Sequence, residues 1–511
     1  MTNVIRSDYN NLLNRVKDLV VLDSAAGIVH WDMETLMPPR AVGLRSEQLS
    51  LISQISHRMS TNPEIGRLLH DITRNPQYSK LNEVEKRNIQ LIQKNYDEQT
   101  ALPEKLVGAI AKQEAITVNT WKRAKAAKSF PMLKAELQKL LDLNREAAEI
   151  LMKVKKTRTP YDALIDIYEP KMTAESIDTI FTPLQQGLTK LLEKIQNSSV
   201  KSDPKILKAT IPVDTQRKVA KDLSQALGYD TTSPKAGGRI DETEHPFTTG
   251  YYDDVRITTH YYPEEFTSSV FSVLHETGHA LYEQNLPQRW KYQPVGMNCS
   301  MGFHESQSRF CENIIGRSHE FWTCWLPKLK KIVAPALLNV SLDDFILAIN
   351  AVKPSKIRIE ADEVTYSLHI IVRFQIEKEL FNGKTSVNDL PAIWNQKYEE
   401  YLGLKIQNDS EGVMQDTHWP SGMYGYFPSY ALGNIYSGHL NKQLTKEIHD
   451  WRNQVEKGNL KNVLKWLKQN VHNYGRLYDT ADLLMKITGK NLDAEPFLQY
   501  LQEKYSKIYM F

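Results

Sequence analysis

The sequence contains an H-E-x-x-H motif, formed by His275, Glu276 and His279. Two histidines four residues apart lie on one face of a helix, about 6 Å apart at Cβ, so both imidazoles can bind one metal ion. Glu276 then lies one position round the helix, where its carboxylate can act on a metal-bound water rather than on the metal. Chance predicts about 0.05 such matches in a chain with this many histidines and acidic residues. The motif alone therefore leaves an ordinary helix with hydrogen-bonded histidines as the alternative.

A catalytic zinc site generally has three protein ligands and one open position. Glu305 follows the motif further along the chain and is predicted to lie near the start of a second helix. His304 is adjacent to it, and Glu312 lies two helical turns further on, on a similar face. The spacing leaves these three residues as alternatives for the third ligand.

Composition excludes several classes of protein. The 511 residues include 64 basic and 61 acidic side chains, for a formal net charge of +3, which argues against binding nucleic acid or a membrane surface through bulk charge. The first residues carry charges throughout, and no run approaches about 18 apolar residues, so we expect neither a secretory signal nor a membrane span. The three cysteines, Cys299, Cys311 and Cys324, are too few for a disulfide framework. They fit a reducing compartment, and we expect a cytoplasmic protein.

Apolar residues recur with helical spacing through most of the chain, most clearly over residues 81–96 and 133–151. No linker rich in Gly, Ser or Pro divides the sequence, so we expect a single domain over residues 1–511. Within it we expect a mostly helical part, a small sheet and then the remaining helices, which include the catalytic ones, at residues 1–230, 231–262 and 263–511.

The predicted sheet rests on a Gly-Gly pair and on β-branched residues. Its strand at residues 255–261 leads to the helix of the H-E-x-x-H motif. The first turn of that helix is predicted at Pro263, Glu264 and Glu265, and its end near Asn285. Residues 255–260 could also present backbone groups to an extended peptide, as edge strands do.

Further motifs occur in a fixed order. They are WDMETLMPPR from Trp31, YDALIDIYEP from Tyr161, HPF from His245, DVRIT from Asp254, HETGH from His275, HESQS from His304, IRIEAD from Ile357, GVMQDTHW from Gly412 and GYFPSY from Gly425. In these motifs and their order the chain resembles the carboxypeptidase Taq family of zinc metallocarboxypeptidases. The resemblance implies a mainly α fold, in which a single large helical domain has a deep substrate groove and a small β-sheet next to the zinc-binding helix. It also implies a homodimer.

The resemblance implies a function as well. Glu305 is then the third zinc ligand beside His275 and His279, with one Zn²⁺ per chain, for which Co²⁺ is able to substitute. The implied activity is hydrolysis of the C-terminal peptide bond by a zinc-activated water, with Glu276 as the general base. The expected partners are peptides with a free C-terminal carboxylate, and neither nucleic acid nor a membrane.

An exopeptidase must bind the free C-terminal carboxylate, and the planar fork of arginine suits this task. By resemblance to the family, Arg358 in IRIEAD binds the substrate terminus. Arg256 in DVRIT is the alternative, although a structural pair with Asp254 explains it more readily. Lys356 offers only a point charge.

The segment QDTHWPSGMYGYFPSY offers donors for the oxyanion of the tetrahedral intermediate, namely His418, Tyr424, Tyr426 and Tyr430. By analogy with related zinc peptidases, His418 and Tyr426 are predicted to be catalytic, and Tyr430 to contact the substrate. The resemblance places His245 beside the active-site cleft as a further substrate contact, without a defined chemical role.

Ligand histidines usually donate their second N–H to a carboxylate or a carbonyl, and Asp416 and Asp362 are predicted as such partners. Two other functions remain compatible with the sequence. One is a zinc oligo-endopeptidase with the same metal core. The other is a catalytically silent helical peptide-binding protein.

Overall fold

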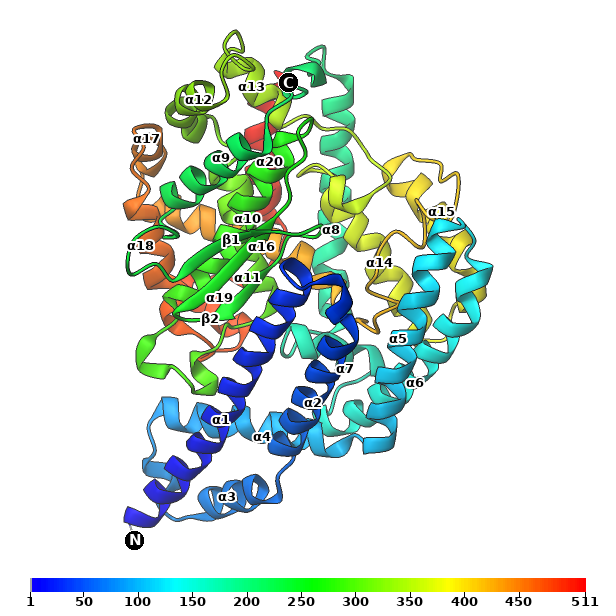
Figure 1. Cartoon of the computed structure of the whole chain (residues 1–511), viewed down its shortest axis with the longest axis vertical. Coiled ribbons are helices and arrows are strands. Elements are labelled where there is room, and N and C mark those ends of the chain that lie inside the picture. The colour runs from blue at the N-terminus through cyan, green and yellow to red at the C-terminus, as the bar shows by residue number, and fades with distance from the viewer. Residues whose placement is uncertain (1) are drawn as a thin grey trace.

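Helices dominate the structure, as the apolar spacing predicts (Figure 1). A computed structural model describes residues 2–511. The first part of the chain forms α1 (Thr2–Thr35), α2 (Val42–Ser60), α3 (Pro63–Arg74), α4 (Glu83–Ala101), α5 (Glu104–Ala126), α6 (Pro131–Lys155), α7 (Pro160–Tyr168), α8 (Ala174–Asn197) and α9 (Val213–Ala226). A small sheet follows, made of β1 (Gly238–Glu242), β2 (Thr248–Tyr251) and β3 (Asp254–Thr259).

The rest of the chain is again helical. It forms α10 (Phe266–Asn285), α11 (Met301–Arg309), α12 (His319–Val333), α13 (Leu342–Ile349), α14 (Tyr366–Phe381), α15 (Leu390–Leu402), α16 (Phe427–Glu447), α17 (Trp451–Glu456), α18 (Lys461–Asn470), α19 (Thr480–Thr488) and α20 (Glu495–Tyr509). A π-helical turn at Phe310–Ile315 continues α11. The prediction of a mainly α fold with a small sheet is confirmed.

Both amphipathic segments singled out in the sequence are helices. α4 begins after Asn82, whose side chain accepts a hydrogen bond from the backbone N–H of Glu85 at 2.9 Å, while the Glu85 carboxylate caps the Asn82 backbone in return. α6 buries the apolar face that includes Leu133, Leu137 and Leu140.

The sheet has the order β1-β3-β2, with β1 parallel and β2 antiparallel to β3. β3 is therefore the central strand, and it packs against α10 with Val255 and Ile257 fully buried. The hypothesis that residues 255–260 form an edge strand is wrong, because ladder hydrogen bonds occupy both sides of β3. The edges of the sheet are β1 and β2.

α10 begins at Phe266, not at Pro263 as predicted. The carbonyl of Pro263 accepts a hydrogen bond from the backbone N–H of Ile211, which holds this segment as a turn outside the helix. Glu265 is the N-cap residue, with an extended φ of −138°. The helix ends at Asn285, just before Pro287, as predicted.

The C-terminal part of α1 packs against the sheet, and α1 contacts β2. Trp31 is 5% exposed, and its ring contacts two guanidinium groups, that of Arg239 in β1 at 4.7 Å and that of Arg256 in β3 at 4.4 Å. Arg256 also pairs with Asp254 at 2.8 Å, the structural pair that the sequence favours. The sheet thus lies between α1 and α10, as Figure 1 shows near the middle of the molecule.

Two groups of buried apolar side chains form the interior. The larger joins residues from α5 to α20 and includes the side chains around α10. The smaller joins α1, α3 and α4. The division of the domain at residues 230 and 262 and the deep groove stay predictions. Within residues 2–511, every helix is too short or too polar to cross a membrane.

One buried carboxyl group supports the helix that carries Glu305. Glu169, which directly follows α7, is fully buried and accepts hydrogen bonds from the backbone N–H of Gly302, at the start of α11, and from the hydroxyl of Ser429 at 2.9 Å. Burial raises the pKa of Glu169 to about 7, although these donors act to lower it.

This raised pKa predicts a pH dependence of stability. The usual glutamate pKa is near 4.5, so between pH 4.5 and about 7 the folded chain holds a proton on Glu169 that the unfolded chain releases. The contribution to stability is therefore fully present below pH 4.5 and is lost as the pH rises through 7. It amounts to about 3 kcal/mol.

Glu169→Gln is consequently expected to be more stable than wild type at pH 8 and to differ little from it at pH 4.5. Denaturant unfolding of both proteins across this range measures the difference. Glu193→Gln, on an exposed face of α8, serves as a matched control with no expected pH dependence. A stability difference that is the same at every pH would contradict the assignment of the buried proton.

Candidate metal centre

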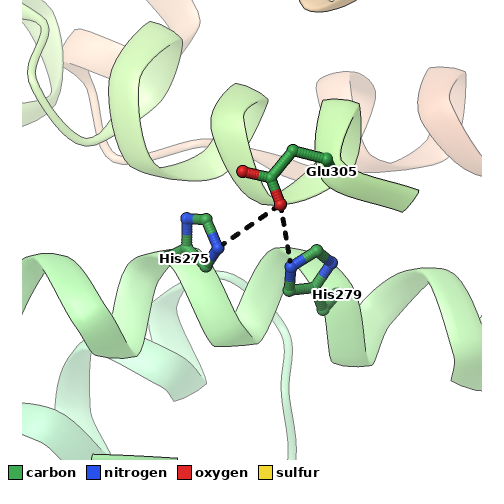
Figure 2. A group of neighbouring side chains, drawn as sticks. All are labelled: His275, His279 and Glu305. Atoms are coloured by element: carbon green, nitrogen blue, oxygen red, sulfur yellow. Dashed lines mark ion pairs between the residues drawn. The ribbon is translucent and has the colours of Figure 1, made fainter. Parts of the chain in front are cut away.

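Two histidines of α10 and one glutamate of α11 point toward one another (Figure 2). Nε2 of His275 lies 3.7 Å, and Nε2 of His279 lies 3.4 Å, from Oε2 of Glu305. The three atoms all lie within 4.8 Å of one another, so one small cation could bind to all of them. Two imidazole nitrogens and one carboxylate oxygen are a donor set typical of catalytic zinc, with a fourth position left for water or substrate. These residues therefore fit the metal that the sequence motif predicts.

Close packing of α10, α11 and α16 brings these side chains together. Gly278, which lies between His275 and His279 in the sequence, faces the backbone of Gln307 and Ser308, with which a Cβ atom would collide. Gly433 of α16 faces the side chain of Glu305 in the same way. The absence of side chains at these two positions lets α11 approach from one side and lets α16 support Glu305 from the other.

The second nitrogen of each histidine faces away from Glu305. Nδ1 of His275 lies 2.8 Å from Oε2 of Glu312. Nδ1 of His279 lies 2.6 Å from Nδ1 of His304. The three alternatives for a third ligand thus occupy different places, because Glu305 faces both Nε2 atoms while His304 and Glu312 lie behind the histidines.

The prediction that Asp416 and Asp362 accept hydrogen bonds from the ligand histidines is wrong. Asp416 accepts hydrogen bonds from two arginines, and Asp362 accepts them from backbone N–H groups at the start of α14, among them that of Thr365 at 2.9 Å. A further partner, Glu283, was not predicted from the sequence, and its Oε1 lies 2.8 Å from Nε2 of His304. Its spacing of four residues after His279 on the same helix was the available signal.

An arginine holds the other oxygen of the glutamate. Nε of Arg309 donates to Oε1 of Glu305 at 2.7 Å, which leaves Oε2 directed at the two histidines. Nη1 of Arg309 also donates to Oε2 of Glu312 at 3.2 Å. Burial opposes ionisation of Glu305, but Arg309 and His275 hold its pKa well below the usual range. Glu305 is therefore an ionised carboxylate with one oxygen available to a cation.

Glu276 is 5% exposed and contacts the edge strand β2. The hydroxyl of Thr248 lies 2.6 Å from Oε2 of Glu276 and 3.1 Å from its backbone carbonyl. Burial raises the pKa of Glu276, while His275 and the Thr248 hydroxyl act to lower it. The sequence did not indicate Thr248, because the position of β2 relative to the helix depends on the pairing of the sheet.

Four of the predicted substrate-binding and catalytic side chains lie in one group. Nε2 of His418 lies 3.1 Å from the hydroxyl of Tyr430, and the Tyr430 ring lies 5.1 Å from that of Tyr426. The guanidinium of Arg358 lies 5.0 Å from the Tyr430 ring, and its Nη1 donates to the hydroxyl of Tyr366 at 2.9 Å. The structure thus brings together Arg358, His418, Tyr426 and Tyr430.

This group is joined to the metal centre through Tyr366. The Tyr366 ring lies 4.2 Å from the guanidinium of Arg309, which in turn holds Glu305. The Tyr366 hydroxyl accepts from Arg358. One tyrosine therefore separates the arginine beside the metal centre from the arginine of IRIEAD.

Arg358 is 7% exposed and shares one carboxylate with a second arginine. Asp416 accepts from Nε and Nη2 of Arg358 at 3.0 and 2.9 Å, and from Nε of Arg373 at 2.7 Å. Burial opposes the charge on Asp416, but the two guanidinium groups keep its pKa well below the usual range. Two cations and one anion leave this buried cluster with one net positive charge. Burial also lowers the pKa of His418 to about 3, so this neighbour is neutral.

Other candidates lie outside this group. Lys356 pairs with Glu411 at 2.8 Å, and Arg256 stacks on Trp31 as described above. Tyr424 is buried with its ring 5.3 Å from that of Phe381. His245 is exposed in the connection between β1 and β2.

Comparisons with known proteins identify the family to which the chain belongs. A family model described as carboxypeptidase Taq (M32) metallopeptidase matches residues 11–505. The chain is 37% identical to thermostable carboxypeptidase 1 of Thermus thermophilus over 508 residues, which cover 98% of this chain and 99% of that protein. It is 35% identical to carboxypeptidase 1 of Bacillus subtilis, with 98% of each chain covered.

A solved structure of similar fold is the M32 carboxypeptidase from Deinococcus radiodurans, with a TM-score of 0.94 at 31% identity, over 99% of this chain and 100% of that one. The carboxypeptidase of Pyrococcus furiosus gives a TM-score of 0.93 at 33% identity, over 98% of this chain and 99% of that one. Family, relatives and structures agree along nearly the whole chain, and the chain belongs to the carboxypeptidase Taq family of metallopeptidases.

Proposed function

We propose that the protein is a zinc-dependent metallocarboxypeptidase that hydrolyses the C-terminal peptide bond of peptides. Family membership supports carboxypeptidase activity, and the convergence of His275, His279 and Glu305 supports a bound metal. The observation that carries the proposal is the buried cluster of Arg358, Asp416 and Arg373, which has a net positive charge. Tyr366 links this cluster to the metal centre, because it contacts both Arg358 and Arg309. A free C-terminal carboxylate is the part of a peptide that such a cluster would bind.

The proposed catalytic roles follow from positions and protonation. When bound, Zn²⁺ supplies a Lewis acid that polarises the scissile carbonyl and lowers the pKa of a coordinated water to about 7. Glu276 accepts a proton from the attacking water and passes it to the leaving amine. Burial raises the pKa of Glu276, and a general base is most effective when its pKa lies near the pH at which the enzyme works.

The substrate contacts complete the proposal. The neutral His418 and the hydroxyl of Tyr426 are donors for the oxyanion, and Tyr430, which lies beside both, contacts the substrate. Arg358 binds the terminal carboxylate. Family resemblance alone supports the proposal that His245 contacts the substrate. The same resemblance supports a homodimer, and the sparse cysteines support a cytoplasmic location.

Metal analysis tests the zinc site. Purified protein is expected to contain about one zinc ion per chain, to lose activity on dialysis against a chelator, and to regain it with Zn²⁺ or Co²⁺. Protein that binds no metal and cleaves no peptide after metal addition would instead fit a catalytically silent peptide-binding protein.

Thr248→Val is expected to lower kcat by about tenfold and to leave the zinc content unchanged, because it removes one hydrogen bond that orients Glu276, worth about 1–1.5 kcal/mol. The pH profile is expected to change too, since the hydroxyl acts to lower the pKa of Glu276. Thr249→Val is a matched control, because neighbouring side chains of a strand point to opposite faces. Equal rates and pH profiles for Thr248→Val and Thr249→Val would contradict this role.

A further inference from the structure

The metal centre contains a histidine with no proposed ligand role. We infer that His304 and Glu283 are positioning residues, which hold His279 in the tautomer that leaves Nε2 free to bind a metal. The inference rests on the proposed zinc site and concerns how one of its ligands is prepared.

Three side chains form a chain of close contacts on α10 and α11. Nδ1 of His279 lies 2.6 Å from Nδ1 of His304, and Nε2 of His304 lies 2.8 Å from Oε1 of Glu283. Asn298 holds the carboxylate by donating to the same oxygen at 3.0 Å. The side chains of His304 and Glu283 are only 14% and 11% exposed, so water has little access to these contacts.

The chemistry of the groups sets the direction of each hydrogen bond. A carboxylate oxygen is an acceptor, so at 2.8 Å Nε2 of His304 donates to Oε1 of Glu283. An imidazole that donates from Nε2 presents Nδ1 as an acceptor in the matching tautomer, and Nδ1 is the atom that faces His279. The short contact between the two imidazoles requires one donor, so Nδ1 of His279 carries a proton. Nε2 of His279 is consequently unprotonated, and this is the atom that faces Oε2 of Glu305 at 3.4 Å.

The reverse arrangement is incompatible with a metal ligand. If His304 donated to His279 through Nδ1, a neutral His279 would carry its proton on Nε2, where the metal must bind. Both nitrogens of His304 are engaged, by His279 and by Glu283, so His304 has no nitrogen left to act as a ligand itself. The role of His304 is therefore to orient His279.

The two ligand histidines are held by different means. His275 contacts the carboxylate of Glu312 directly, at 2.8 Å. His279 reaches a carboxylate only through a second imidazole. Partners that orient metal ligands typically change metal affinity by about 10–100-fold when they are removed.

Substitutions at residue 304 can break the two contacts one at a time. The side-chain oxygen of Asn can occupy the place of Nδ1 and accept from His279, but Asn does not reach Glu283. The amide nitrogen of Gln can occupy the place of Nε2 and donate to Glu283, but Gln leaves His279 without an acceptor. Leu removes both contacts.

Zinc affinity, measured by competition with a chromophoric chelator, shows how much each contact contributes to metal binding and does not depend on enzymatic activity. His304→Leu and His304→Gln are expected to bind zinc about 10–100-fold more weakly than wild type. His304→Asn is expected to retain most of the affinity. His439→Leu, at a buried histidine whose Nε2 lies 3.0 Å from the carbonyl of Asp493, is a control with no expected effect on affinity.

The outcomes separate the inference from the proposed function. Wild-type affinity in His304→Leu, or Gln binding zinc at least as tightly as Asn, would overturn the positioning role in favour of packing. A change in the Co²⁺ absorption spectrum to that of a site with one fewer ligand would overturn it in favour of direct ligation. Failure of the zinc site itself appears separately, as wild-type protein that binds no zinc.

Discussion

Glu276→Gln is expected to keep its zinc and to lose peptide hydrolysis, with kcat lower by on the order of 10²–10⁴-fold. Glutamine has the shape of glutamate but cannot take a proton from water. The side chains of His275, His279 and Glu305 are unchanged, so the metal site stays intact. The Thr248 hydroxyl can still donate to the amide oxygen, so the side chain also keeps its position.

Zinc content and steady-state kinetics on the same preparation check this result. Glu264→Gln, at an exposed position in the turn before α10, is a control for the loss of a negative charge near the helix and should behave as wild type. A variant at position 276 that lost its zinc would make Glu276 part of the metal site. One that kept both zinc and a wild-type rate would rule it out as the general base.

Arg358→Ala is expected to lower kcat/KM for free-acid peptides by at least about 100-fold, mainly through KM. Hydrogen bonds to a charged group contribute about 1.5–3 kcal/mol each, and a bidentate arginine–carboxylate pair has two of them. The fold should tolerate the change, because Arg373 still neutralises Asp416. The expected loss is therefore one of substrate binding and not of stability.

The comparison of substrates makes this test specific. Arg358→Ala should lose far more activity on a free-acid peptide than on the matching C-terminal amide, and Arg358→Lys should recover only part of the loss, because lysine lacks the planar fork. Lys356→Gln, at the surface pair with Glu411 in the same loop, should behave as wild type. An unchanged kcat/KM in Arg358→Ala would move the carboxylate-binding group elsewhere.

The sequence predicted the convergence of the three candidate ligands because two lie on one helix and family resemblance selects the third. It could not separate Glu305 from His304 and Glu312 by spacing, since all three belong to the same helical stretch. Their distinction depends on how α11 packs on α10, which Gly278 permits. Packing of this kind has no local sequence signature.

Contacts between residues that are far apart in the sequence were either not predicted or predicted wrongly. Asp416 precedes His418 in the same motif, yet its carboxylate binds the arginines of two distant segments. Thr248 reaches Glu276 only because β2 pairs on the open side of β3. The same pairing makes β3 central and removes it as an edge for a peptide. The spacing of four residues between His279 and Glu283 places both on one face of the helix. It does not predict a contact with His304, because the position of His304 depends on how α11 packs on α10.

The most direct test of the account is the cleavage of one peptide with a free C-terminal carboxylate and of the same peptide with an amidated C-terminus. Products are read by mass spectrometry with the zinc-loaded wild-type enzyme. We predict stepwise loss of single residues from the free acid and almost no cleavage of the amide. Internal cleavage of both peptides at similar rates would contradict the account and would make the protein an oligo-endopeptidase with the same metal centre.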